Sequence, residues 1–252
     1  MAKSGWLFRL EYKLETDKGL IVDNPKPVHW NPGPFEITLK DGIGKVEMNE
    51  PCLTIEEARQ KVAPFLRSWE IYAMLSMGRP FEFKFVNAEP SSRETSPWNP
   101  PSRIKVLQIF AQAEYAINKS EYPLPPESFH ADQYVEVMWL RFQDYLQHRS
   151  SLTAMGYFCL TVLKGHAGGK KQAARIYGIN QKVLSKLADL TTTVGDHYVA
   201  RKFEKGAFRP HTKKEKKWIE VTLKILIRRA GEITCSGTGV LPIITMNDLP
   251  PL

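Results

Sequence analysis

Alternation of apolar and polar residues dominates the first part of the chain. Residues 6–14, 34–39 and 81–86 each alternate with a period of two, which is typical of strands that bury one face against a core. The Asp-Gly pair at 41–42 predicts a tight turn, and residues 46–48 predict another strand after it. This part of the chain is therefore expected to be rich in strands.

The segments between these strands are rich in proline. Residues 24–34 hold four prolines and a glycine and predict an extended connection, while the polar, proline-rich residues 88–102 predict a loop. Residues 103–117 alternate again, well enough to predict two further strands. The expected total is five to seven strands.

One helix interrupts the strands at residues 54–76. Thr54 is its expected N-cap, because Glu57 stands three residues later in the arrangement of a capping box. Apolar residues then recur at helical spacing. Residues 1–125 are accordingly predicted to form a strand-rich domain with one long helix, and the fold class of the chain is predicted to be α+β.

The pattern changes to helical periodicity after residue 126. Thr212 and Glu215 predict a second capping box, at the start of a helix whose apolar residues form one face. Residues 126–235 are predicted to form an all-helical domain, and residues 236–252 an extended tail that packs back on the body. The expected helices are at about 132–148, 150–164, 170–177, 180–190 and 213–229.

Residues 170–189, KKQAARIYGINQKVLSKLAD, resemble a helix-turn-helix unit. Two short helices that cross closely need a small residue between them, and Ala174 is expected in that place. The turn needs a residue that tolerates a positive φ, which Gly178 supplies four residues later. The apolar residues expected between the helices are Ala173, Tyr177, Ile179, Leu184 and Leu187.

The polar residues of this unit suit contact with nucleic acid. Asparagine and glutamine can read adenine edges, whereas lysine and arginine contact guanine or phosphate. The candidate nucleic-acid-binding residues are therefore Lys170, Lys171, Arg175, Asn180, Gln181, Lys182, Ser185 and Lys186. Packing of two helices in any all-helical domain would produce a similar apolar pattern, so the alternative is a unit with no ligand.

Charge is unevenly distributed along the chain. Residues 139–232 hold 19 Lys and Arg against 7 Asp and Glu, a balance of +12 within a total of +8. Such asymmetry favours a polyanionic partner, DNA or RNA, for the helical domain. A basic surface that serves only solubility is the alternative.

A second motif, Arg141 followed by His148, points to a different function. This pair satisfies the spacing of the HEPN family of helical ribonucleases, which the helical domain also resembles in its all-α layout. The resemblance implies metal-independent RNA cleavage by these two residues, as a toxin or defence component. Phe142 follows the arginine, where that family usually has a polar residue. The seven-residue separation predicts that both side chains lie on one face of one helix.

Other chemistry is sparsely represented. Cys52, Cys159 and Cys235 lie far apart and show no metal-ligand spacing, which favours a reducing, cytoplasmic location and predicts neither metal nor cofactor. No apolar stretch is long enough to predict a membrane span. Enzymatic activity is left open, with a non-enzymatic function favoured.

The whole chain resembles a group of uncharacterised bacterial proteins of similar length. The similarity includes YPLPP, the GYFCLTVLKG helix, YGINQKVLSKL and the closing LPIITMNDLP. It implies a bacterial origin and one integrated two-part architecture, and it carries no activity. A homodimer or a protein partner bound through the N-terminal domain, or a scaffold role in a larger assembly, therefore stays open.

Overall fold

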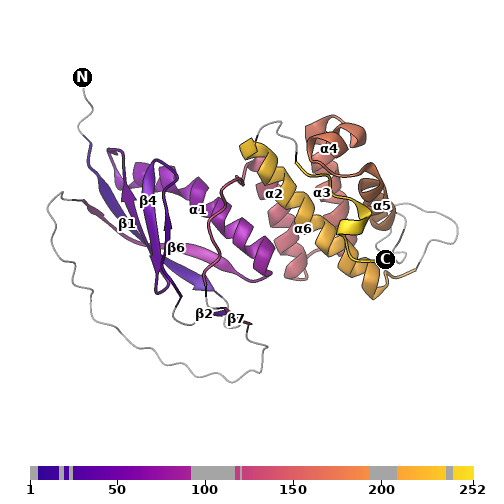
Figure 1. The fold of residues 1–252 in the computed structure, drawn as a ribbon, viewed down its shortest axis with the longest axis horizontal. Coiled ribbons are helices and arrows are strands. Elements are labelled where there is room, and N and C mark those ends of the chain that lie inside the picture. Colours follow the sequence, from indigo (N-terminus) through magenta and orange to yellow (C-terminus); the bar gives the residue numbers. More distant parts are fainter. Residues whose placement is uncertain are drawn as a thin grey trace. The chain divides into compact units, whose positions relative to one another are not determined.

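A computed structural model describes residues 5–16, 20–22, 25–91, 117–119, 121–192, 194, 209–236 and 241–252. The chain divides into two compact units, residues 1–125 and 126–252, referred to below as the N-terminal and C-terminal units. An antiparallel sheet in the first and helices in the second confirm the α+β class (Figure 1).

The N-terminal unit is built on a five-stranded antiparallel sheet of order β3-β4-β5-β1-β6. Its strands are β1 (Phe8–Thr16), β3 (Val28–Trp30), β4 (Phe35–Lys40), β5 (Ile43–Met48) and β6 (Phe81–Pro90). The parallel pair β2 (Leu20–Val22) and β7 (Ile117–Lys119) forms a separate small sheet.

Two expectations for the strands were wrong. The proline-rich connection at residues 24–34 contains β3, which adds to the edge of the sheet, where prolines beside a strand remove no ladder hydrogen bond. Strand β6 continues to Pro90 instead of ending at residue 86, because its pairing with β1 resumes after an irregularity in register. The two strands predicted at 103–117 lie outside the described residues, apart from Ile117 in β7.

Helix α1 (Ile55–Met77) packs on the face of the sheet that carries the apolar side chains (Figure 1). Trp69 is fully buried and its ring contacts Phe81 and Phe83 of β6, with centroids 5.9 and 5.1 Å apart. Thr54 caps the helix as predicted, by accepting from Glu57 N, but the Glu57 carboxylate accepts from Leu53 N. The other face of the sheet carries polar and charged residues.

The C-terminal unit is helical. Helix α3 contacts every other long helix of the unit, and α5 approaches it so closely that a Cβ at Gly156 would lie 2.7 Å from Thr191 Cγ2. None of the helices in the described part of the chain is long and apolar enough to cross a membrane. The helices are α2 (Gln133–Leu146), α3 (Leu152–Ala167), α4 (Lys170–Ile176), α5 (Gln181–Thr192), α6 (Lys213–Ser236) and the short 3-10 helix η1 (Met246–Asp248).

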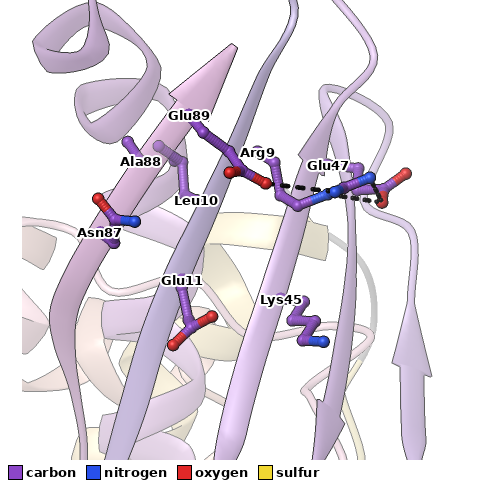
Figure 2. A pocket seen from close by; sticks show the side chains of 8 residues that line it. All are labelled: Arg9, Leu10, Glu11, Lys45, Glu47, Asn87, Ala88 and Glu89. Atoms are coloured by element: carbon purple, nitrogen blue, oxygen red, sulfur yellow. Dashed lines mark hydrogen bonds and ion pairs between the residues drawn. The ribbon is translucent and has the colours of Figure 1, made fainter. Parts of the chain in front are cut away.

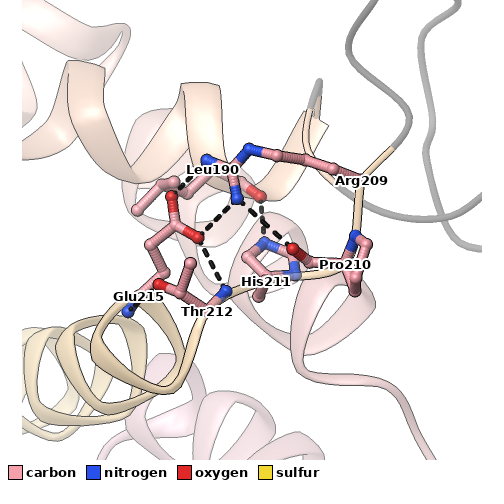
Figure 3. Close-up of polar contacts among 6 residues, drawn as sticks. All are labelled: Leu190, Arg209, Pro210, His211, Thr212 and Glu215. Atoms are coloured by element: carbon pink, nitrogen blue, oxygen red, sulfur yellow. Dashed lines mark hydrogen bonds and ion pairs between the residues drawn. The ribbon is translucent and has the colours of Figure 1, made fainter.

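Helix α6 begins with the capping box that the sequence predicts (Figure 3). Glu215 N donates to Thr212 Oγ1 at 3.2 Å, and Thr212 N donates to Glu215 Oε2 at 2.8 Å. The Arg209 guanidinium donates to both Glu215 oxygens, at 2.5 and 2.7 Å. These hydrogen bonds lower the pKa of Glu215 to about 2, against the opposing effect of partial burial.

Candidate nucleic-acid interface

Helices α4 and α5 form the helix-turn-helix arrangement expected from residues 170–189. The five apolar residues predicted between the helices are buried: Ala173, Tyr177, Ile179, Leu184 and Leu187. Ala173 supplies the small residue in the interior, whereas Ala174 is half-exposed, so the role assigned to Ala174 was wrong by one position. The apolar pattern therefore holds, with the helix rotated slightly from the expected orientation.

The turn between the two helices depends on Gly178. Its φ is +58°, in the left-handed region where a side chain is disfavoured. A Cβ at this position would also lie 3.2 Å from Leu241 O and 3.3 Å from Leu241 Cβ. Glycine is therefore required here for two independent reasons, backbone conformation and the close approach of another segment.

That segment is the tail, residues 241–249. Ile244 N donates to Gly178 O and Asn180 N donates to Ile244 O, each at 2.8 Å, so the tail forms a parallel bridge with the turn. Arg229 Nη2 of α6 donates to Pro242 O at 2.9 Å, and Leu249 is buried. The tail thus connects α6 to the start of α5 and braces the helix-turn-helix from one side.

Asn180 has a structural role that the sequence reading did not include. Its side-chain oxygen accepts from Lys182 N at 2.9 Å, so Asn180 caps the N-terminus of α5. A bidentate contact with adenine needs this same oxygen together with the amide nitrogen. The expected base-reading role of Asn180 therefore competes with its capping role.

The outer face of α5 carries the other predicted residues of that helix. Gln181 and Lys182 are exposed, and Ser185 and Lys186 are half-buried one turn further on. Lys170 Nζ of α4 donates to Ser185 Oγ at 3.1 Å, which brings two of the predicted residues together across the helix pair. Cations from both helices therefore meet on one surface.

Helix α4 adds two exposed cations, Lys171 and Arg175. They stand four residues apart and so lie on the same face of the helix. No described carboxylate forms an ion pair with the cations of α4 or α5, and no Asp or Glu occurs between residues 168 and 188. The first acid after this run is Asp189, and within the described part of the chain the cations of α4 and α5 form no ion pair.

A hydrogen bond between the buried Tyr177 and the exposed His166 also joins α3 to the end of α4. The Tyr177 hydroxyl lies 2.5 Å from His166 Nδ1 of α3, and the His166 ring lies against Tyr134 of α2 at a centroid distance of 4.3 Å. Burial raises the pKa of Tyr177 to about 12, so its hydroxyl stays protonated at neutral pH. Sequence reasoning missed this contact, because the three residues are far apart in the chain.

Arg141 and His148 do not share a helix face, so that expectation was wrong. Helix α2 ends at Leu146, and His148 follows it with a φ of +58°. The Arg141 guanidinium lies 3.9 Å from the Asp144 carboxylate and 5.0 Å from the centroid of the Phe158 ring. The structure therefore gives Arg141 partners within its own unit.

A hollow of about 240 Å³ on the polar face of the sheet is a second candidate site (Figure 2). Arg9 is one of the residues that line it, and its guanidinium lies 3.0 Å from Glu47 and 3.3 Å from Glu89. The remaining polar lining includes Glu11 and Lys45. Because its central cation is already paired with two acids, this hollow offers little excess charge to a ligand.

Metal ligands and nucleophiles do not gather in the described part of the chain. The structure places no three His, Cys, Asp or Glu residues there in a group able to hold a metal ion. Cys52 and Cys159 are buried, and burial raises the pKa of both thiols. The thiolate form, which would be the nucleophile, is therefore disfavoured at these positions.

Comparison with known proteins adds no functional assignment. The chain matches no protein-family model, no curated protein and no solved structure.

Proposed function

We propose that the C-terminal unit binds duplex DNA, with the outer face of α5 in the major groove and the cations of α4 on the phosphate backbone. The observation that carries this proposal is how side chains are distributed on the α4–α5 pair. The apolar residues point inward, and the outward positions present amide, hydroxyl and cationic groups. These are the groups that contact base edges and phosphates.

The dimensions of α5 support the proposal. Twelve residues span about 18 Å at 1.5 Å per residue, and the major groove of B-DNA, about 12 Å wide, admits a helix. The major groove of duplex RNA is too narrow and deep for side chains to read. Duplex DNA is therefore favoured over duplex RNA.

The position of each residue on α4 or α5 suggests whether it would contact base edges or phosphates. Gln181 and Lys182, which are exposed in the first turn of α5, would contact base edges. Lys170, Lys171 and Arg175 would contact phosphates, which fix the register without reading sequence. No catalytic step is needed for this function. A cytoplasmic location suits it, since all three cysteines are unpaired.

Binding to a labelled 20-base-pair duplex, followed by fluorescence anisotropy over a salt series, tests the proposal. Three phosphate contacts, by Lys170, Lys171 and Arg175, would give a slope of log affinity against log salt of about −2.7. A slope near zero, or no binding at physiological salt, would contradict DNA binding. A single-stranded RNA of the same length serves as the comparison, and shortening of that RNA during the assay would instead favour a nuclease.

A further inference from the structure

The first turn of α6 carries four lysines in five positions, here called the α6 lysines: Lys213, Lys214, Lys216 and Lys217. All four are exposed, and no described carboxylate forms an ion pair with them. They carry a concentration of positive charge outside the helix-turn-helix unit, and the proposed contacts of α4 and α5 make no use of it.

Helix stability does not explain these lysines. Cations at the N-terminus of a helix face the positive end of its dipole, where acids are preferred. Lys213 and Lys217 stand four residues apart, and Lys214 and Lys217 three apart, so their like charges repel. The cluster therefore disfavours the helix that carries it, which points to a role outside folding.

The one acid within the cluster is engaged elsewhere. Both oxygens of Glu215 accept from Arg209, and Oε2 also accepts from Thr212 N (Figure 3). Glu215 is 8% exposed, whereas the lysines around it face solvent. Its negative charge therefore offsets the Arg209 guanidinium. The next acid along the helix, Glu220, accepts from the Tyr145 hydroxyl and forms no ion pair with the α6 lysines.

Two contacts place the α6 lysines beside α5. His211 Nε2 donates to Leu190 O at 2.8 Å, which joins the start of α6 to the last turns of α5. At the other end, the tail joins Arg229 of α6 to Asn180 before α5. The two helices therefore run antiparallel, with the α6 lysines next to the C-terminal end of α5.

This arrangement puts the α4 cations and the α6 lysines at different points along α5. Lys170 of α4 contacts Ser185, whereas His211, just before α6, contacts Leu190, five residues or about 7 Å further along α5. With α5 in the major groove, the two groups of cations would meet the phosphate backbone at separate places.

We propose that the α6 lysines form a second phosphate-binding site, which contacts the DNA backbone at a place separate from that contacted by α4. This inference rests on the proposed function. The site takes phosphate groups without regard to base sequence, because flexible ammonium groups act as point charges.

The test compares two full-length variants that each lose three lysines. One is Lys213→Gln/Lys214→Gln/Lys217→Gln; the matched control is Lys13→Gln/Lys26→Gln/Lys40→Gln, at exposed positions in the N-terminal unit. Glutamine keeps helix propensity, so α6 is expected to stay folded, which circular dichroism checks. Affinity for the labelled duplex is measured over the same salt series.

The α6 variant is expected to bind at least 10-fold more weakly at physiological salt, with a salt slope shallower by about 2 to 3, on any duplex sequence. The control is expected to stay within about 2-fold of the parent. Equal affinities and slopes for the two variants would overturn the second site while leaving the proposed function standing. Failure of the parent protein itself to bind DNA would overturn both.

Discussion

The polar face of the sheet and the outer face of the α4–α5 pair use their charges in different ways. On the sheet, opposite charges lie next to one another: Arg9 of β1 contacts Glu47 of β5 and Glu89 of β6, and within β6 Lys84 contacts Glu82 at 3.0 Å. On α4 and α5 all the charges from residue 170 to 186 are positive, and none is paired with a described acid. The charges of the sheet face are paired within that face, whereas those of the α4–α5 face are not.

This difference shows that whether charged side chains form ion pairs indicates a binding surface better than the number of those side chains does. Exposed ion pairs contribute little to stability, about 0–1 kcal/mol each, but they cancel the field that a charged partner would meet. Lysines without an acidic partner gain no stabilisation from an ion pair, and their attraction for a polyanion is not reduced by a neighbouring acid. The helical face is therefore the stronger candidate for a ligand, even though the hollow of about 240 Å³ lies on the sheet face.

The largest effect is expected from removal of the tail. Deletion of residues 241–252 would eliminate two backbone hydrogen bonds to the turn and the buried side chain of Leu249. The expected loss is about 3–5 kcal/mol in the free energy of unfolding of the C-terminal unit, with loss of DNA binding. Urea denaturation followed by tryptophan fluorescence measures it. Deletion of residues 250–252 alone is the control, and equal midpoints for the two deletions would contradict the bracing role.

The next largest effect is a difference in stability between alanine variants of two glycines that have a positive φ. Gly178→Ala should cost about 2 kcal/mol, because the left-handed backbone disfavours alanine and the tail lies within 3.3 Å of the new Cβ. Gly42→Ala, at φ +74° with no atom within 4 Å of its Cβ, should cost about 1 kcal/mol. Thermal unfolding of both variants checks the difference, and a larger cost at Gly42 would be inconsistent with the tail contact.

Acid stability should change with Glu215. Its pKa in the folded protein is about 2, below the ordinary value of 4.5, so its stabilising contribution is present above pH 4.5 and is lost as the pH falls towards 2. Glu215→Gln is expected to lower the free energy of unfolding by about 1–2 kcal/mol at pH 7, a value reduced for the half-exposed Arg209. Near pH 2 the variant and parent should be equally stable. A difference that persists unchanged at low pH would refute the linkage.

The smallest effect is expected when the two acids that pair with Arg9 on the polar face of the sheet are removed. Glu47→Gln/Glu89→Gln leaves Arg9 without its two acids and makes this face more positive. Unfolding is expected to become easier by less than about 1 kcal/mol, and DNA affinity at low salt to rise by no more than about 2-fold. Urea denaturation and anisotropy measure the two quantities. An increase in DNA affinity comparable with the contribution of the α4–α5 face would mean that the net charge of the protein, and not the placement of its charges, governs binding.

Local signals in the sequence predicted much of the C-terminal unit. The apolar spacing around Gly178 and the capping pair Thr212 and Glu215 depend on residues within a few positions of one another, and both are confirmed. The left-handed conformation of His148 was not predictable in this way. Helix ends fray or turn according to tertiary packing, so a two-turn spacing does not guarantee a shared helix face.

The features that the sequence did not predict depend on contacts between distant segments. Strand β3 forms within a proline-rich stretch because β4 provides a partner for it. The position of the tail against the turn, and the antiparallel approach of α5 and α6, likewise arise from single contacts such as that between His211 and Leu190. The lysine run at the start of α6 is visible in the sequence, but its position relative to α5 depends on such contacts.

The most direct test of the central claim is a comparison of two charge reversals of equal size. Lys182→Glu/Lys186→Glu changes the outer face of α5, and Lys13→Glu/Lys40→Glu changes exposed lysines of the sheet. Affinity for the 20-base-pair duplex at physiological salt is predicted to fall at least 100-fold for the first variant and less than 3-fold for the second. Equal losses for the two variants would contradict the claim that the unpaired helical face is the nucleic-acid interface.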